Sequence, residues 1–214
     1  MLILMIALTL TSMLTTHSVY AQGETSANVN PSQVFYDATN GTVGTLFNIT
    51  VTVTGLNDSK VWQVKMGFND SIINVTRWYE PTWDPTYVFY GMTTLAVPGP
   101  VKPTYNPGWL GVGAALFPAP TVGGGFTGNG TLCIIAFNIT ATPPAGQNYT
   151  CNFNIAYASD TFWIRTGETT KRSFTTYNGG QYTIIPELAP LMILATLTAA
   201  TIVAARARKR IRKV

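Results

Sequence analysis

Two uncharged apolar segments, one at each end of the chain, confine any water-soluble domain to the residues between them. Residues 1–14 are almost wholly apolar, and polar residues 15–18 separate them from Val19, Tyr20 and Ala21. Small side chains at Val19 and Ala21 suit the −3 and −1 positions of a signal peptidase site. We therefore expect a cleaved secretory signal peptide over residues 1–21. No Lys or Arg precedes the apolar run, so an uncleaved anchor is the alternative.

The second apolar segment runs from Leu188 to Ala205, which is 18 residues without a charge. As a helix it would be roughly 27 Å long, enough to cross the hydrocarbon core of a bilayer. Residues 206–214 hold six basic side chains, which by the positive-inside rule face the cytoplasm. We expect a single-pass cell-membrane protein with a transmembrane helix over residues 185–205, a cytoplasmic tail over 206–214 and an extracellular domain over 22–184. The alternative is a buried helix with a nucleic-acid-binding tail.

The net charge of +4 belongs to the tail. Without the six basic tail residues, seven basic side chains face nine acidic ones, which leaves a charge of −2. A domain of this charge has no general attraction for nucleic acid. We expect the tail to set the topology and to contact anionic lipid.

Asn-x-Ser/Thr motifs are unusually frequent between the two apolar segments. Such motifs are acceptors for N-glycosylation in exported proteins, although a Thr-rich chain also produces them by chance. The eight candidate sites are Asn40, Asn48, Asn57, Asn69, Asn74, Asn129, Asn138 and Asn148. We expect a glycoprotein.

The central region has the composition of a β protein, rich in Thr, Val, Tyr and Phe, with few helix formers. In residues 44–54 the apolar side chains alternate with polar ones, which predicts a strand with one face in a core. That core face comprises Phe47, Ile49, Val51 and Val53. Further strands are predicted over residues 60–68 (apolar set Val61, Val64, Met66 and Phe68), 87–94, 109–116, 132–139, 149–156 and 181–185. Many short strands at this spacing indicate an all-β sandwich.

Three stretches together resemble a cohesin domain, a family within the wider carbohydrate-binding jelly-roll group. They are residues 30–32 with 44–53 (NPS and GTLFNITVTV), residues 61–75, and residues 128–139 (GNGTLCIIAFNI). In the second stretch Phe68-Asn69 stands where Tyr-Asp is usual, and Asp70 stands where Pro is usual. The resemblance implies a jelly-roll β-sandwich of about nine strands. Cohesins of cellulosomes bind dockerins, but no family-specific dockerin-contact residue can be identified in this chain.

The boundary between the domain and the membrane helix carries a second resemblance. Ile185-Pro186-Glu187-Leu188, followed by apolar and then basic residues, is similar to the archaeal Pro-Glu-Phe type of sorting signal, with Leu188 in place of Phe. It implies that a sortase-like enzyme cuts near Glu187. The alternative is a plain membrane anchor.

The sequence lacks the side chains of the common catalytic sites. Its only histidine, His17, lies in the expected signal peptide, which removes Ser-His-Asp and Cys-His arrangements and imidazole metal sites. One carboxylate pair, Glu80 and Asp84, flanks an aromatic-rich stretch, but such acids are commoner as loop caps. We expect no enzyme activity, no metal and no cofactor.

The two cysteines, Cys133 and Cys151, share phase with core residues on successive predicted strands. A simple hairpin centred near Gly146 would place them about six residues out of register, too far apart to bond. The strand order implied by the cohesin resemblance puts the two strands in opposite sheets, where a disulfide is feasible. Two buried free thiols are the alternative.

Exposed aromatic side chains are the candidate binding residues. Trp78, Tyr79, Trp83 and Trp109 lie beside Pro and Gly in loop-like sequence, and flat rings of this kind stack on sugar rings, although aromatics also fill cores. We expect a membrane-anchored, cohesin-like binding module for carbohydrate binding or cell-surface adhesion, with polysaccharide or a cell-surface protein as partner. The alternatives are a structural cell-envelope glycoprotein and a protein-docking scaffold with a dockerin-type partner.

Overall fold

The computed structural model describes residues 23–37, 40–96, 104–106, 108–144, 146–155 and 160–185, together with Thr198. The expected signal peptide, the basic tail and nearly all of the expected membrane helix lie outside these residues. Within the described ranges, no helix is long and apolar enough to cross a membrane.

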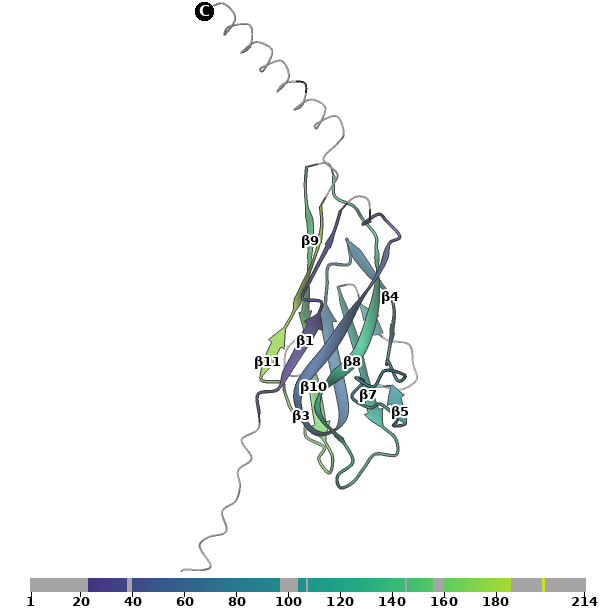
Figure 1. Ribbon diagram of the computed structural model, residues 1–214, viewed down its shortest axis with the longest axis vertical. Helices are drawn as coiled ribbons and strands as arrows, with labels where there is room; N and C mark the ends of the chain where they lie inside the picture. Colours follow the sequence, from purple (N-terminus) through teal and green to yellow (C-terminus); the bar gives the residue numbers. More distant parts are fainter. Residues whose placement is uncertain are drawn as a thin grey trace, which may run out of the picture.

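The described residues form a β-sandwich (Figure 1). Its strands are β1 (Ser26–Asn30), β2 (Gln33–Tyr36), β3 (Leu46–Gly67), β4 (Ile73–Tyr79), β5 (Thr94–Ala96), β6 (Thr104–Asn106), β7 (Trp109–Leu116), β8 (Phe126–Ile139), β9 (Tyr149–Ile155), β10 (Phe162–Arg165), β11 (Thr176–Asn178) and β12 (Gly180–Ile184). The strands outnumber the nine that were expected, because β2, β5, β6, β10 and β11 have only three or four residues each. Strands this short carry no readable alternation.

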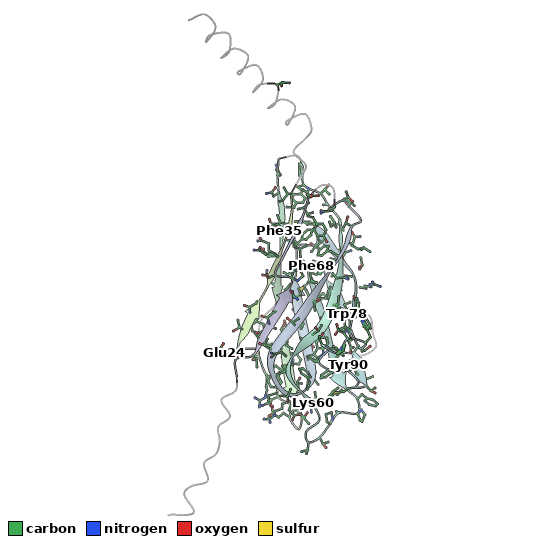
Figure 2. The ribbon with its side chains drawn as sticks, viewed as in Figure 1. Glu24, Phe35, Lys60, Phe68, Trp78 and Tyr90 are labelled. Atoms are coloured by element: carbon green, nitrogen blue, oxygen red, sulfur yellow. The ribbon has the colours of Figure 1, made fainter. Side chains whose placement is uncertain are left out.

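Strand β3 belongs to both layers of the sandwich. Its first half pairs with β1 and β8, and its second half pairs with β7 and β10. The ribbon reverses direction at the lower end of the domain (Figure 1), close to Lys60 (Figure 2). The reversal uses two residues with left-handed backbones, Gly55 at φ 71° and Asp58 at φ 54°, a conformation that costs little for Gly and is tolerated by Asp. The two strands predicted over 44–54 and 60–68 are therefore one strand with a bend.

Pairing around the two halves of β3 defines two sheets. The first sheet has the order β11-β1-β3-β8-β4. In the second sheet β7 lies between β3 and the short strands β5 and β6, and β10 pairs on the other side of β3. The end of β3 also meets β9, which continues through β12 to β2. Because β3 runs through both sheets, the ladder of paired strands is continuous from one sheet to the other.

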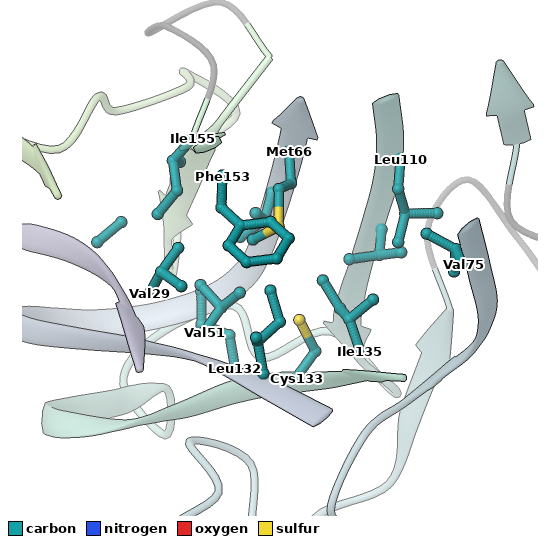
Figure 3. Close-up of a cluster of buried hydrophobic side chains, with 14 of the residues drawn as sticks. Val29, Val51, Met66, Val75, Leu110, Leu132, Cys133, Ile135, Phe153 and Ile155 are labelled. Carbon is teal, nitrogen blue, oxygen red and sulfur yellow. The ribbon is translucent and has the colours of Figure 1, made fainter. Parts of the chain in front are cut away.

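The core lies between the inner faces of the two sheets (Figure 3). The predicted core face of residues 44–54 is confirmed, since Phe47, Ile49, Val51 and Val53 are all buried. The ring of Phe47 stacks on Phe137 of its own sheet, at 5.6 Å, and on Tyr182 of the opposite sheet, at 4.7 Å between centroids. These contacts join the layers, as aromatic pairs commonly do in sandwich cores.

Two strand predictions need correction. Residues 87–94 do not form a strand: Tyr87, Val88 and Phe89 are all buried in a run of turns, and only Thr94–Ala96 is extended. Three consecutive buried residues cannot share one face of a strand, so this segment packs as a loop against the core. In residues 60–68, Val61 points outward and Trp62 fills the core position instead.

Candidate functional site

The outer face of the second sheet is built by strict alternation along β3 and β7. Because Trp62, Val64 and Met66 are buried, the side chains between them point outward. On β7 the outward positions are Trp109, Gly111, Gly113 and Ala115. Two of these four are glycines, so β7 itself adds no side chain in the middle of this face, where Gln63 and Lys65 of β3 lie beside Gly113 and Gly111. We refer to this surface as the β3–β7 face.

An apolar row crosses the β3–β7 face at right angles to its strands. Leu95 of β5 pairs with Ala115 of β7, Ala115 pairs with Val61 of β3, and Val61 pairs with Ile164 of β10. Residues paired in this way point to the same side of a sheet. Leu95 is 49% exposed, and the other three are half-buried. Four strands thus place a continuous apolar strip on the surface.

The apolar row continues beyond the end of β7. Phe117 follows Ala115 in outward phase, is 55% exposed, and donates its backbone N–H to Thr93 O at 2.9 Å. It borders a shallow hollow of about 170 Å³, whose apolar lining includes Met92, Pro118 and Pro120. Contiguous apolar surface of this kind is typical of interaction sites.

Charged and aromatic groups occupy the other end of the β3–β7 face. The Lys65 ammonium lies 4.1 Å from the centre of the Trp109 ring and forms an ion pair with Asp160 at 2.9 Å. Gln63 Nε2 donates to Asp160 O at 3.0 Å. A Cβ added to Gly111 would lie 3.3 Å from the Trp109 ring, so the ring extends over the glycine. This end is polar and held in place.

The structure brings together only two of the four predicted binding aromatics. Tyr79 and Trp83 stack at 5.5 Å, and the Arg77 guanidinium lies 5.5 Å from the centre of the Tyr79 ring. Trp83 is 67% exposed. Trp78 packs against the core, and Trp109 lies on the β3–β7 face, in the opposite sheet. The four residues therefore do not form one platform.

The carboxylate pair noted in the sequence braces a loop. Glu80 Oε2 accepts hydrogen bonds from the Tyr87 hydroxyl at 2.6 Å and the Thr94 hydroxyl at 2.7 Å. Together with burial, this carboxylate raises the pKa of Tyr87 far above its ordinary value. Asp84 Oδ1 accepts the Thr86 backbone N–H at 2.8 Å. Across the described ranges, no three His, Cys, Asp or Glu side chains converge as metal ligands.

Cys133 and Cys151 are buried free thiols in the structure, which is the alternative to the disulfide considered above. Cys151 pairs with Tyr182, whose ring stacks on Phe47, and Phe47 pairs with Phe137. Cys133 lies four residues before Phe137 on the same strand, which is roughly 13 Å at the rise of a β-strand. The two thiols therefore occupy different levels of the core, beyond the reach of a disulfide.

Three of the predicted glycosylation sites share the outer face of the first sheet. Asn74 of β4 pairs with Asn138 of β8, and Asn48 of β3 pairs with Ala136, two residues along β8. Asn48 and Asn74 are exposed, and Asn138 is half-buried. The other sites, Asn40, Asn57, Asn69, Asn129 and Asn148, are exposed in turns, in the β3 bend or near strand ends. None of the eight lies among the outward residues of the β3–β7 face.

Sequence reasoning missed the apolar residues of this face. Leu95, Phe117 and Ile164 lie in short apolar runs in short or irregular segments, where the phase of the strand cannot be read. A usable signal was present in β7, where glycines alternate with Leu110, Val112 and Ala114. Such a pattern marks a strand with a smooth outer face.

Comparison with known proteins supports the fold. No family model matches the chain, and no curated protein matches its sequence. Among solved structures, a non-cellulosomal cohesin from the archaeon Archaeoglobus fulgidus is similar, with a TM-score of 0.51, 10% identity, and coverage of 76% of this chain and 91% of that one.

Two cohesins solved with dockerin partners are also similar. The third cohesin of ScaC from Acetivibrio cellulolyticus has a TM-score of 0.51 and 15% identity, covering 75% of this chain and 99% of that one. A type I cohesin–dockerin complex from Clostridium thermocellum gives a TM-score of 0.54 and 9% identity, covering 76% and 94%. At these identities the likeness shows the fold: the described residues form a cohesin-like β-sandwich.

Proposed function

We propose that this protein is a docking module that binds a partner protein through the β3–β7 face. The observation that carries the proposal is the apolar row Leu95–Ala115–Val61–Ile164 on the outer face of the sheet, extended by Phe117. Protein interfaces combine an apolar centre with a polar rim and aromatic anchors. Trp109, Lys65 and Asp160 supply such a rim and anchor at one end.

A dockerin-type module is the proposed class of partner. Two of the similar solved structures are cohesins bound to dockerins, and the apolar row of the β3–β7 face offers a partner contacts on four neighbouring strands. The aromatic side chains give less support to polysaccharide as the main ligand. Tyr79 contacts both Trp83 and Arg77, and the Lys65 ammonium lies over Trp109, so neighbouring side chains already contact both rings.

The proposed glycans favour the same choice of face. Sugars on Asn48, Asn74 or Asn138 would cover the outer face of the first sheet, whereas the β3–β7 face has no acceptor asparagine. A glycan on one face blocks protein contact there and leaves the opposite face accessible. We further propose that the domain is displayed outside the cell and anchored by the helix expected over residues 185–205, directly after β12.

Site-specific crosslinking tests which face docks. A photo-crosslinking amino acid replaces Ala115 on the β3–β7 face or Thr52 on the outer face of the first sheet. Each full-length variant is incubated with an envelope extract of the source cells and irradiated. We expect one discrete protein adduct from position 115 and none from position 52. Adducts of equal yield from both positions, or adducts only between copies of this chain, would contradict docking by this face.

Direct binding to the crosslinked partner gives the quantitative test. Leu95→Asp places a charge inside the apolar row and should weaken binding at least tenfold, about 1.4 kcal/mol. Leu46→Asp is the matched control, because Leu46 is 64% exposed and lies outside the β3–β7 face. Equal affinities for the two variants would refute the assignment.

A further inference from the structure

A polar groove of about 350 Å³ lies where β2, β9 and β12 run side by side. Its polar side chains are Ser32, Gln33, Asn152, Asn154 and Gln181, and the pair Gly179–Gly180 also lines it. The volume falls in the range of small-molecule sites in proteins. The groove is separate from the apolar row of the β3–β7 face and plays no part in the docking proposed above.

The carboxamides of the groove are aligned by strand pairing. Gln181 of β12 pairs with Gln33 of β2 on one side and with Asn152 of β9 on the other. Gln181 Nε2 donates to Asn152 Oδ1 at 3.2 Å, which orients both side chains. Within the described chain, the side chains of Gln33 and Asn154 make no hydrogen bond and can turn to a ligand.

The chemistry of these groups selects a neutral, hydroxyl-rich ligand. A carboxamide offers two donors and an acceptor, and a hydroxyl both donates and accepts, so a row of amides matches a row of hydroxyls. No Asp, Glu, Lys or Arg lines the groove, so it offers no charge to complement a phosphate, a carboxylate or a cation. None of its asparagines begins an Asn-x-Ser/Thr motif, so the groove is not itself a glycosylation site.

An exposed aromatic ring lies at the end of the amide row. Phe35 follows Gln33 on the same face of β2, pairs with Thr183 of β12 and is 60% exposed. Figure 2 shows Phe35 in the upper part of the domain, remote from Lys60 at the β3 bend. A ring in this position can stack on the apolar face of a sugar, since aromatic faces combine large apolar area with defined geometry.

We propose that Phe35 and the amides of Gln33, Asn152, Asn154 and Gln181 form a binding site for a neutral oligosaccharide. The sugar ring stacks on Phe35, and its hydroxyls exchange hydrogen bonds with the amide row. The site differs in position and residues from the aromatic set suggested by the sequence. With this site, the domain would dock a protein on one surface and hold a neutral glycan chain on another.

Titration of the full-length, 15N-labelled chain tests the site. The probes are neutral hexasaccharides: cellohexaose, xylohexaose, mannohexaose and maltohexaose. With one of them we expect saturable shifts of the side-chain amide signals of Gln33, Asn152, Asn154 and Gln181. Calorimetry then gives the affinity. Gln181→Ala and Phe35→Ala should each lower it about tenfold, because one good hydrogen bond or stacking contact contributes about 1.4 kcal/mol.

Gln147→Ala is the control, since it removes an exposed amide outside the groove and should leave the affinity unchanged. Circular dichroism and thermal unfolding establish that each variant is folded. Two results would overturn the proposal: no hexasaccharide moves the groove amides, or Gln181→Ala and Phe35→Ala bind sugar as tightly as the control. Because the readout requires no partner protein, its failure would leave the docking proposal standing.

Discussion

The ammonium group of Lys65 lies over the indole ring of Trp109 on the neighbouring strand, 4.1 Å from the ring centre. The same ammonium forms an ion pair with Asp160 at 2.9 Å, so the cation is held from two sides. Trp109 was predicted from the sequence to stack on sugars. In the structure its ring lies at one end of the β3–β7 face, covered in part by a cation.

We predict a measurable coupling between Lys65 and Trp109. In a double-mutant cycle with Lys65→Met and Trp109→Leu, the coupling free energy should be about 0.5–1 kcal/mol, the usual size of an exposed cation–π contact. The Asp160 ion pair is partly exposed to solvent and adds little. Urea unfolding of the full-length wild type, the two single variants and the double variant measures this coupling free energy. Additive effects of the two substitutions would show that the contact has no energetic role.

Phe137 should be among the costliest core residues to truncate. It is fully buried, and its ring lies 5.2 Å from Phe68, 5.2 Å from Phe153 and 5.6 Å from Phe47. Phe137→Ala removes all three contacts and leaves a cavity, which should lower the free energy of unfolding by about 3–5 kcal/mol. Leu46→Ala, at an exposed position of β3, should change it by less than about 0.5 kcal/mol. Chemical unfolding compares the two variants, and similar losses of unfolding free energy would contradict the assigned core.

Alternation predicted the long strands because one of their faces is buried and the other is wet. Cys133, Ile135, Phe137 and Ile139 are all fully buried, as their spacing predicts. Alternation did not predict the loop at Tyr87–Phe89. The Glu80–Tyr87 hydrogen bond and packing against the core hold this loop, and such tertiary contacts leave no periodic pattern in the sequence. The β3–β7 face also escaped prediction: its apolar row comes from four strands, and only the strand register brings those residues together.

The thiols of Cys133 and Cys151 should be unreactive in the folded protein. Burial raises the pKa of both groups, so little thiolate is available to attack a reagent. We expect no labelling by iodoacetamide in the native state, two labelled thiols after unfolding, and no change of the thermal midpoint with dithiothreitol. A disulfide would instead block labelling after unfolding, and its reduction would cost about 2–4 kcal/mol.

Stability should fall at alkaline pH. Burial raises the pKa of Cys133 above the ordinary 9.0, and the pKa values of Tyr87 and Tyr182 above the ordinary 10.0. Above these ordinary values the unfolded chain loses protons that the folded chain retains, so the unfolded state gains stability. Each such group contributes up to about 1.4 kcal/mol per pH unit.

Urea unfolding between about pH 8 and about pH 11 measures this decline, in the range where thiols and phenols ionise. Tyr182→Phe removes one titrating group from the core, so its stability should fall less steeply than that of the wild type above pH 10. Parallel curves for the two proteins would contradict the buried position of the Tyr182 hydroxyl.

The bend of β3 should depend on the glycine at position 55. Gly55 has φ 71°, and a Cβ there would lie 2.6 Å from the backbone oxygen of Glu24. Its N–H also donates to Asn129 Oδ1 at 2.9 Å. Gly55→Ala therefore adds a left-handed strain of about 1–2 kcal/mol to a backbone clash, and we expect a total loss of about 2–4 kcal/mol. Gly123→Ala is the control for the strain alone, because Gly123 has φ 62° but nothing within 4 Å of an added Cβ. The Gly123→Ala variant should lose only the strain energy.

Chemical unfolding measures the loss of stability in both variants. Equal losses would mean that Glu24 can move away, and that the bend is fixed by backbone conformation alone.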